Sequence, residues 1–199
     1  MGVRRIRKTA INHIHIHNDI SNTANHLRRR VEEMEVAGNR EGIMLDVTAC
    51  LVMLAFTSES RINFIGAKKV ANWDERTPFR DKLKIVLKTL GIKPDQAKRP
   101  YSAIKRLQEF RNIIAHGKPS VVAVDEVLEV GPEDQYDYVD LRADWERFLS
   151  ADFMRQCSED IDQIWKQLLE AAGIESHETL THGSYSFALI EELPPGLGS

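Results

Sequence analysis

The residues best suited to chemistry lie close together in the segment 110–119, where Arg111 and Asn112 are followed by His116. Arginine is permanently charged and its planar fork can bind two phosphate oxygens, whereas histidine can give or take a proton near neutral pH. Cleavage of RNA needs both roles, because the 2′-hydroxyl must lose a proton and the leaving 5′ oxygen must gain one. The extra charge on the phosphorus must also be balanced. The segment therefore predicts phosphodiester chemistry.

A helix must deliver these side chains, and it is predicted from about Tyr101 to His116. Its apolar residues recur at spacings of four, three and four: Ala103, Leu107, Phe110 and Ile114. Five residues on an ideal helix correspond to about 500°, which would leave Arg111 and His116 roughly 140° apart. The two can converge only where the helix ends, and Gly117 with Pro119 predicts that end. There the helix dipole favours the protonated imidazole, and Asn112 shares its face.

A purely structural role would explain the same residues. A histidine at a helix end commonly caps the helix, and an arginine on an amphipathic helix is commonly a surface residue. The bare spacing also arises by chance, because Arg7 and His13 fit it as well. The polar Asn112 directly after Arg111 and the amphipathic helix before them distinguish the second pair.

With this context, the segment 111–117, read as Arg-Asn-Ile-Ile-Ala-His-Gly, resembles the signature of the HEPN superfamily. That signature is an arginine followed four to six residues later by a histidine, commonly with a polar residue directly after the arginine. The resemblance implies a metal-independent ribonuclease that needs no cofactor and acts as a homodimer, with two signature pairs facing one cleft. It implies catalytic roles for Arg111 and His116. Asn112 and the nearby Lys118 would bind or orient the substrate.

A second polar group is expected at the end of the central helix, where Glu59 and Asn63 stand four residues apart and share a face. The pair looks like the acidic or polar position that some HEPN proteins direct at the same cleft, and Glu59 is the stronger candidate. A solvated helix end, or a salt bridge to Arg61 or Lys68, would also explain these residues.

Three histidines near the N-terminus, His13, His15 and His17, alternate with isoleucines. In an extended segment their imidazoles would all point one way, as a metal site requires. No cysteine or carboxylate accompanies them, so we expect an exposed terminal strand and no metal. The basic run 4–8 could attract phosphates, but a disordered basic terminus is the commoner state of such a run.

The apolar periodicity of the chain predicts an all-α fold, an antiparallel bundle of four or five helices over residues 18–173. Helices are expected over 18–36, 41–66, 77–91 and 101–116, and from 144 or 150 to 172. The β-branched residues of 121–139 predict a small β-hairpin insertion. Residues 1–17 would form a basic, histidine-rich segment and residues 174–199 a mobile tail.

The composition describes one globular domain, with 199 residues, 42% hydrophobic and 29% charged. Cys50 and Cys157 each lie inside an apolar helical pattern, which predicts buried, reduced thiols and a cytoplasmic location. The apolar run 43–56 is shorter than the ~20 residues that span a bilayer, so no membrane span is expected. The basic start also lacks the apolar stretch of a signal peptide.

Two functions remain open. The first is an RNA-cleaving homodimer, a toxin or phage-defence component with an antitoxin or another operon-encoded protein as its partner. The second is a catalytically inactive HEPN module that binds RNA, a nucleotide or a partner protein. The intact Arg111 and His116 favour the first. The acidic stretch 125–162 favours the second, because acidic residues near the cleft repel RNA.

Overall fold

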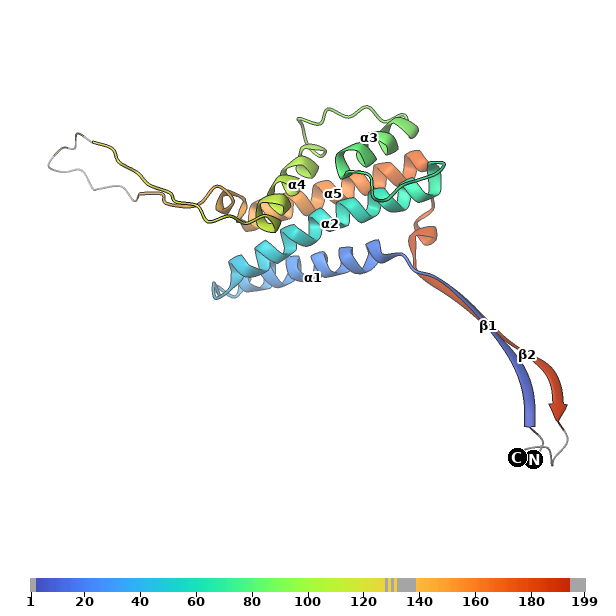
Figure 1. The fold of residues 1–199 in the computed structure, drawn as a ribbon. Coiled ribbons are helices and arrows are strands. Elements are labelled where there is room, and N and C mark those ends of the chain that lie inside the picture. The colour runs from blue at the N-terminus through green and yellow to red at the C-terminus, as the bar shows by residue number, and fades with distance from the viewer. Residues whose placement is uncertain (1–2, 128, 130, 132–138, 194–199) are drawn as a thin grey trace.

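The computed structural model describes residues 3–127, 129, 131 and 139–193 (Figure 1). These residues form five α-helices and a two-stranded antiparallel sheet. The helices are α1 (Ile16–Val36), α2 (Ile43–Lys69), α3 (Phe79–Thr89), α4 (Ser102–Ala115) and α5 (Ala151–Ala172), and the strands are β1 (Val3–His13) and β2 (His182–Leu193). Short 3-10 helices cover Glu146–Phe148 and Ser176–Thr179. The expectation of a mainly helical chain is confirmed, and each helix begins and ends close to its predicted bounds.

The central helix is α2, which contacts α1, α3, α4 and α5 (Figure 1). Its buried residues are spread around the helix and include Val47, Leu51, Ala55, Ile62 and Ile65. A helix that is apolar on several faces is expected where other helices enclose it. By length and composition α2 is also the one helix of the described residues that could cross a membrane, a test that core helices of soluble proteins pass as well.

The ends of two helices follow local sequence signals. The side chain of Ser150 accepts a hydrogen bond from the backbone N–H of Phe153 and caps α5, which selects Ser150 over Asp144 as the start. Gly173 ends α5 in the left-handed conformation, with φ of 58°. α4 stops at Ala115, with His116 as its C-cap, so the predicted end of the signature helix is confirmed.

The sheet joins the two ends of the chain. β1 and β2 pair antiparallel from Val3 opposite Leu193 to His13 opposite His182, with a bulge beside Ile6. Residues 182–193, expected to lie in a tail, therefore form a strand, and the N-terminal segment has a partner. Part of the predicted hairpin lies outside the described residues, and its described residues, 121–127, 129, 131 and 139, belong to no strand.

Candidate functional site

The last turns of α4 present the signature residues. Phe110 is completely buried beside the ring of Phe148, which fixes the rotation of the helix about its axis. The next residue, Arg111, is therefore carried to the edge of the core, where a third of its side chain is exposed. Asn112 and His116 are exposed.

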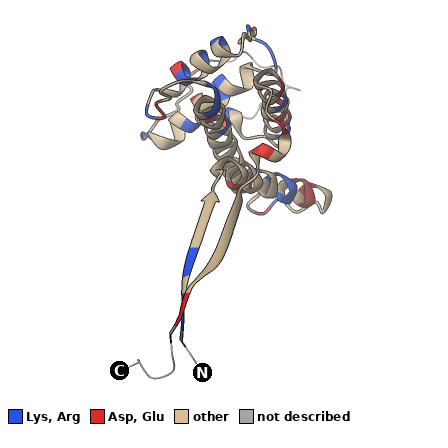
Figure 2. Cartoon of the chain, turned by 90° about the vertical axis from the view of Figure 1, so that its right-hand side faces the viewer, with Lys and Arg blue, Asp and Glu red and all other residues tan. Residues whose placement is uncertain are grey.

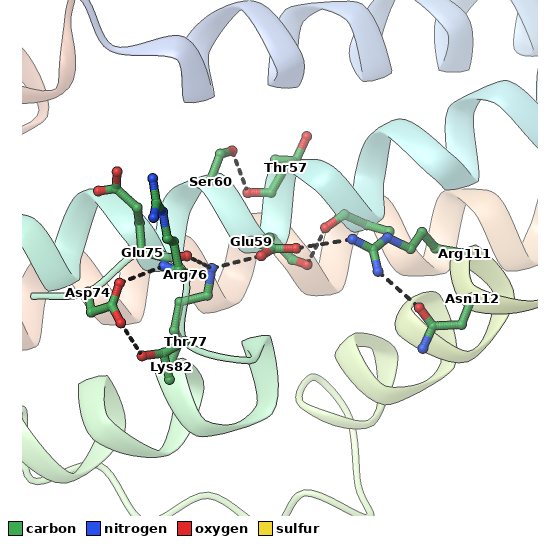
Figure 3. A network of polar contacts seen from close by, with 12 residues as sticks. Thr57, Glu59, Ser60, Asp74, Glu75, Arg76, Thr77, Lys82, Arg111 and Asn112 are labelled. Carbon is green, nitrogen blue, oxygen red and sulfur yellow. Dashed lines mark hydrogen bonds and ion pairs between the residues drawn. The ribbon is translucent and has the colours of Figure 1, made fainter. Parts of the chain in front are cut away.

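Arg111 of α4 reaches Glu59 of α2 (Figure 3). Its Nη2 lies 3.6 Å from Oε2 of Glu59, and its Nη1 donates a hydrogen bond of 2.9 Å to Oδ1 of Asn112. The guanidinium also lies 5.6 Å from the centre of the Phe56 ring. The structure thus brings together three of the predicted site residues, Glu59, Arg111 and Asn112.

Glu59 has a second cationic partner, Lys82 of α3. The Nζ of Lys82 donates to Oε1 of Glu59 at 2.7 Å and to the backbone oxygen of Glu75 at 3.1 Å (Figure 3). Lys82 is 99% buried, so Glu59 is its main source of charge compensation. Two cations share one carboxylate, which leaves the cluster of Glu59, Lys82 and Arg111 with a net charge of about +1 at neutral pH.

Lys82 was not among the residues proposed from the sequence, although a signal was available. It lies one helical turn before Val86, and Leu83, Val86 and Leu87 form the buried face of α3. A lysine on a buried face is uncommon unless it is paired. Glu59 is that partner. Among the contacts of the described residues, Glu59 does not form the salt bridge to Arg61 or Lys68 that was the structural alternative in the sequence analysis. Arg61 itself binds Asp162 at 2.9 Å.

His116 and Lys118 lie at the exposed end of α4 and just beyond it. The backbone N–H of His116 donates to the backbone oxygen of Asn112 at 3.0 Å, which closes the helix. Among the contacts of the described residues, none joins the imidazole to Arg111, Asn112 or Glu59. The site therefore has an ordered cationic part and an adjoining histidine that is free to meet a ligand.

Asn63 faces a different part of the molecule. It lines a cavity of about 320 Å³ together with His15, His17 and Phe64, where β1 leads into α1. Its Oδ1 is buried and has no hydrogen-bond partner among the described residues. Although Glu59 and Asn63 are one turn apart, only Glu59 reaches Arg111.

The N-terminal histidines occupy three different environments. His17 is buried against the rings of Phe64 and Trp165. Burial lowers the pKa of His17 to about 4, with smaller contributions from His15 and Arg61, so the ring is neutral at pH 7. His15 is half-buried, and His13 is exposed and stacks on His182. In the described parts of the chain, no three His, Cys, Asp or Glu side chains are grouped as a metal site would need.

Both cysteines are free and buried, as predicted. Burial raises the pKa of the Cys50 thiol to about 12 and that of Cys157 to the same value. Neither thiol is therefore a nucleophile at neutral pH.

A wider cavity of about 530 Å³ lies between α5 and the segment that leads into α4, with Arg99, Tyr101 and Lys166 in its lining. The side chain of Arg99 is already held by Asp160, at 2.9 Å. Neither this cavity nor the one beside Asn63 includes Arg111 or His116. Arg111 is partly exposed, and Asn112 and His116 are exposed, on the surface of the single chain.

No family model matches the chain, and no curated protein or solved structure matches it either. The likeness to HEPN proteins therefore rests on residues 111–117 and on the order of the helices.

Proposed function

We propose that the protein is a metal-independent endoribonuclease of the HEPN type, which cuts RNA by attack of the 2′-hydroxyl on the adjacent phosphorus. Arg111 balances the charge that develops on the phosphoryl oxygens, and His116 moves protons to or from the reacting oxygens. Asn112 and Lys118 bind or orient the substrate. The proposed setting is a cytoplasmic toxin or defence system, in which an antitoxin or operon partner restrains the activity.

The observation that carries this proposal is the contact between Glu59 and Arg111. A guanidinium held by a carboxylate on one side and by Asn112 on another has a restricted orientation, as a catalytic charge requires. Arg111 lies in the last turns of α4 and His116 caps the end of the same helix, on an accessible surface. The net positive charge of the cluster of Glu59, Lys82 and Arg111 suits a phosphate.

The proposed active form is a homodimer built on an antiparallel HEPN bundle. One histidine cannot easily act as base and acid at two opposed oxygens of the same phosphate. Two copies related by a twofold axis would supply two signature pairs to one cleft. The open surface around Arg111 and His116 is compatible with such a cleft between subunits.

The second candidate is an inactive HEPN module that binds RNA, a nucleotide or a protein. The same contact favours it, because the Glu59 carboxylate offsets much of the Arg111 charge that catalysis would use. The acidic stretch 125–162 adds repulsion against RNA.

Incubation of labelled single-stranded RNA with the purified protein in EDTA separates the two candidates. We expect cleavage that leaves a 2′,3′-cyclic phosphate and a 5′-hydroxyl, and loss of this cleavage in His116→Ala. His26→Ala, which removes an exposed histidine of α1, is the matched control and should cleave like the wild type. Equal cleavage by His116→Ala would remove the proposed role of His116. RNA that is bound but left intact by every variant would support the inactive module.

A further inference from the structure

The sheet extends from the helices as a ribbon of two strands, β1 and β2 (Figure 1). Within the described part of the chain no third strand joins it, so each strand has one open edge with backbone groups that pair with no strand. Every side chain described in 4–13 and 182–192 is exposed. An isolated two-stranded ribbon is marginally stable in water, and three or more strands with an apolar face are needed for independent stability.

Between Ile6 and Ala10 one face of the ribbon is mainly apolar, with Lys8 as its charged residue. Residues directly opposite each other in the ladder share a face, and on this one Ile6 lies opposite Leu189, Lys8 opposite Phe187 and Ala10 opposite Tyr185. The rings of Tyr185 and Phe187 are 6.0 Å apart, and Tyr185 is 77% exposed. So much exposed apolar area on one face indicates a surface that a partner extends or covers.

The two open edges differ in charge. β1 carries Arg4, Arg5, Arg7 and Lys8, and charged residues of this kind protect edge strands from pairing with other chains. β2 has an uncharged run of eight residues, 183–190, with its two acids, Glu191 and Glu192, at the far end. Those acids pair with Arg5 and Arg4 of β1. Figure 2 shows the charges of the ribbon gathered toward the end remote from the helices.

We propose that β2 pairs through its open edge with β2 of a second copy of this chain, antiparallel about a twofold axis. The product is a four-stranded sheet in the order β1, β2, β2 of the second copy and β1 of the second copy. In a pairing centred on Phe187, this residue lies opposite its own copy, Glu191 lies opposite Gly183, and no like charges meet. The same operation on β1 would place two copies of Lys8 opposite each other, which disfavours that edge.

This twofold axis is perpendicular to the sheet, so the apolar faces of both ribbons lie on the same side. Tyr185, Phe187 and Leu189 of the two copies then form one continuous surface. The ribbon leaves the helices where α1 begins, whereas the signature lies where α4 ends, at the other end of the helices (Figure 1). The contact is therefore distinct from a twofold contact at Arg111, and it holds whether or not the protein cleaves RNA.

Ser186 and Thr9 provide a matched pair for the test, because they lie directly opposite each other on the same face of the ribbon. Ser186→Lys places a charge beside the edge that is proposed to pair, and Thr9→Lys places the same charge beside the edge that is proposed to stay open. In sedimentation velocity without RNA, we expect the wild type and Thr9→Lys to associate. Ser186→Lys should have a dissociation constant about tenfold or more higher, with unchanged far-ultraviolet circular dichroism.

Equal association of all three proteins, equal losses in both variants, or a monomeric wild type would overturn the proposal. A wild type that gains mass only with RNA or with anionic vesicles would point instead to one of those as the partner of the ribbon.

Hydrogen exchange of the wild type gives a measurement that needs no variant. Pairing at the β2 edge protects successive amides over 183–190, whereas equal alternation of fast and slow amides in β1 and β2 would contradict it. Both readouts are independent of RNA cleavage.

Discussion

The Glu59 carboxylate lies 3.6 Å from the guanidinium of Arg111 and joins the central helix α2 to the end of α4. The carboxylate restricts the orientation of Arg111 and also reduces its net charge. These effects oppose each other in catalysis, because orientation helps a charge to act at one point and neutralisation weakens it. Which effect dominates decides between the two candidate functions.

Substitutions of Arg111 and Glu59 distinguish the effects. Arg111→Ala should lower RNA cleavage by about 100-fold or more, as loss of a charge-stabilising donor commonly does. Glu59→Gln keeps the shape of the side chain but releases the charge of Arg111. It should lower cleavage if orientation dominates and raise it if neutralisation dominates. Initial rates on one labelled RNA measure both. Arg29→Ala, an exposed arginine of α1, should cleave like the wild type, and a loss as large as that of Arg111→Ala would show a general charge effect.

Glu59 also has a structural role that can be measured without RNA. Among the described residues, removal of its carboxylate leaves the buried Lys82 with only the Glu75 backbone oxygen as a partner. Glu59→Ala should therefore lower the free energy of unfolding by about 3 kcal/mol, the usual cost of leaving a buried charge unpaired. Addition of Lys82→Met should recover much of that loss, because the unpaired charge is gone. Urea unfolding measures each step.

Glu109 supplies the control, since it pairs with Arg147 at 2.9 Å on the exposed surface. Glu109→Ala should change the free energy of unfolding by less than about 1 kcal/mol. If Lys82→Met fails to improve on Glu59→Ala alone, the buried charge is not the cause of the loss.

The sequence predicts the helices well because their signals are local. Apolar residues at spacings of three and four define each buried face, and Ser150 and Gly173 bound α5 with their own side chain or backbone. The contact of Glu59 with Arg111 depends on how α2 and α4 pack, which periodicity does not give. The family resemblance alone placed Glu59 near the signature.

The ribbon could not be predicted from either strand by itself. β1 and β2 lie at opposite ends of the sequence, so no turn signal connects them. An alternating pattern was present in 184–189, where Tyr185, Phe187 and Leu189 are separated by serine and alanine. The alternation indicates a strand but does not identify its partner, and a strand without a partner resembles a tail.

The stability of the protein should depend on pH through His17. Its folded-state pKa of about 4 lies below the ordinary value of 6.5, so between these values the unfolded chain binds a proton that the folded chain does not. Stability is therefore fully present above about pH 6.5 and is lost as the pH falls toward 4, by at most about 3 kcal/mol from this one group. Urea unfolding at pH 4.5 and 7.5 measures the loss. His17→Gln should reduce the dependence and His26→Gln should leave it unchanged, whereas equal slopes in all three proteins would exclude His17 as the source.

The buried thiols give a test of folding that needs no mutation. Because Cys50 and Cys157 are buried and their pKa values are raised to about 12, neither should react with a thiol reagent at pH 8 in the folded protein. Both should react in denaturant. Rapid labelling of one thiol under native conditions would show that the helix around it opens readily.

Gly66 of α2 packs directly against the indole of Trp73, and a Cβ at this position would overlap the ring. Alanine in place of glycine inside a helix normally stabilises it by roughly 0.5–1 kcal/mol. Here the overlap should outweigh that gain, because the half-buried Trp73 ring packs against the core and forcing packed groups aside costs about 1–3 kcal/mol. Gly66→Ala should therefore lower the free energy of unfolding. In a Trp73→Leu background the ring is absent and the helix preference should dominate, so the same substitution should raise it. Urea unfolding of the four proteins measures this change of sign, and a stabilising Gly66→Ala in the wild type would show that Trp73 can move without cost.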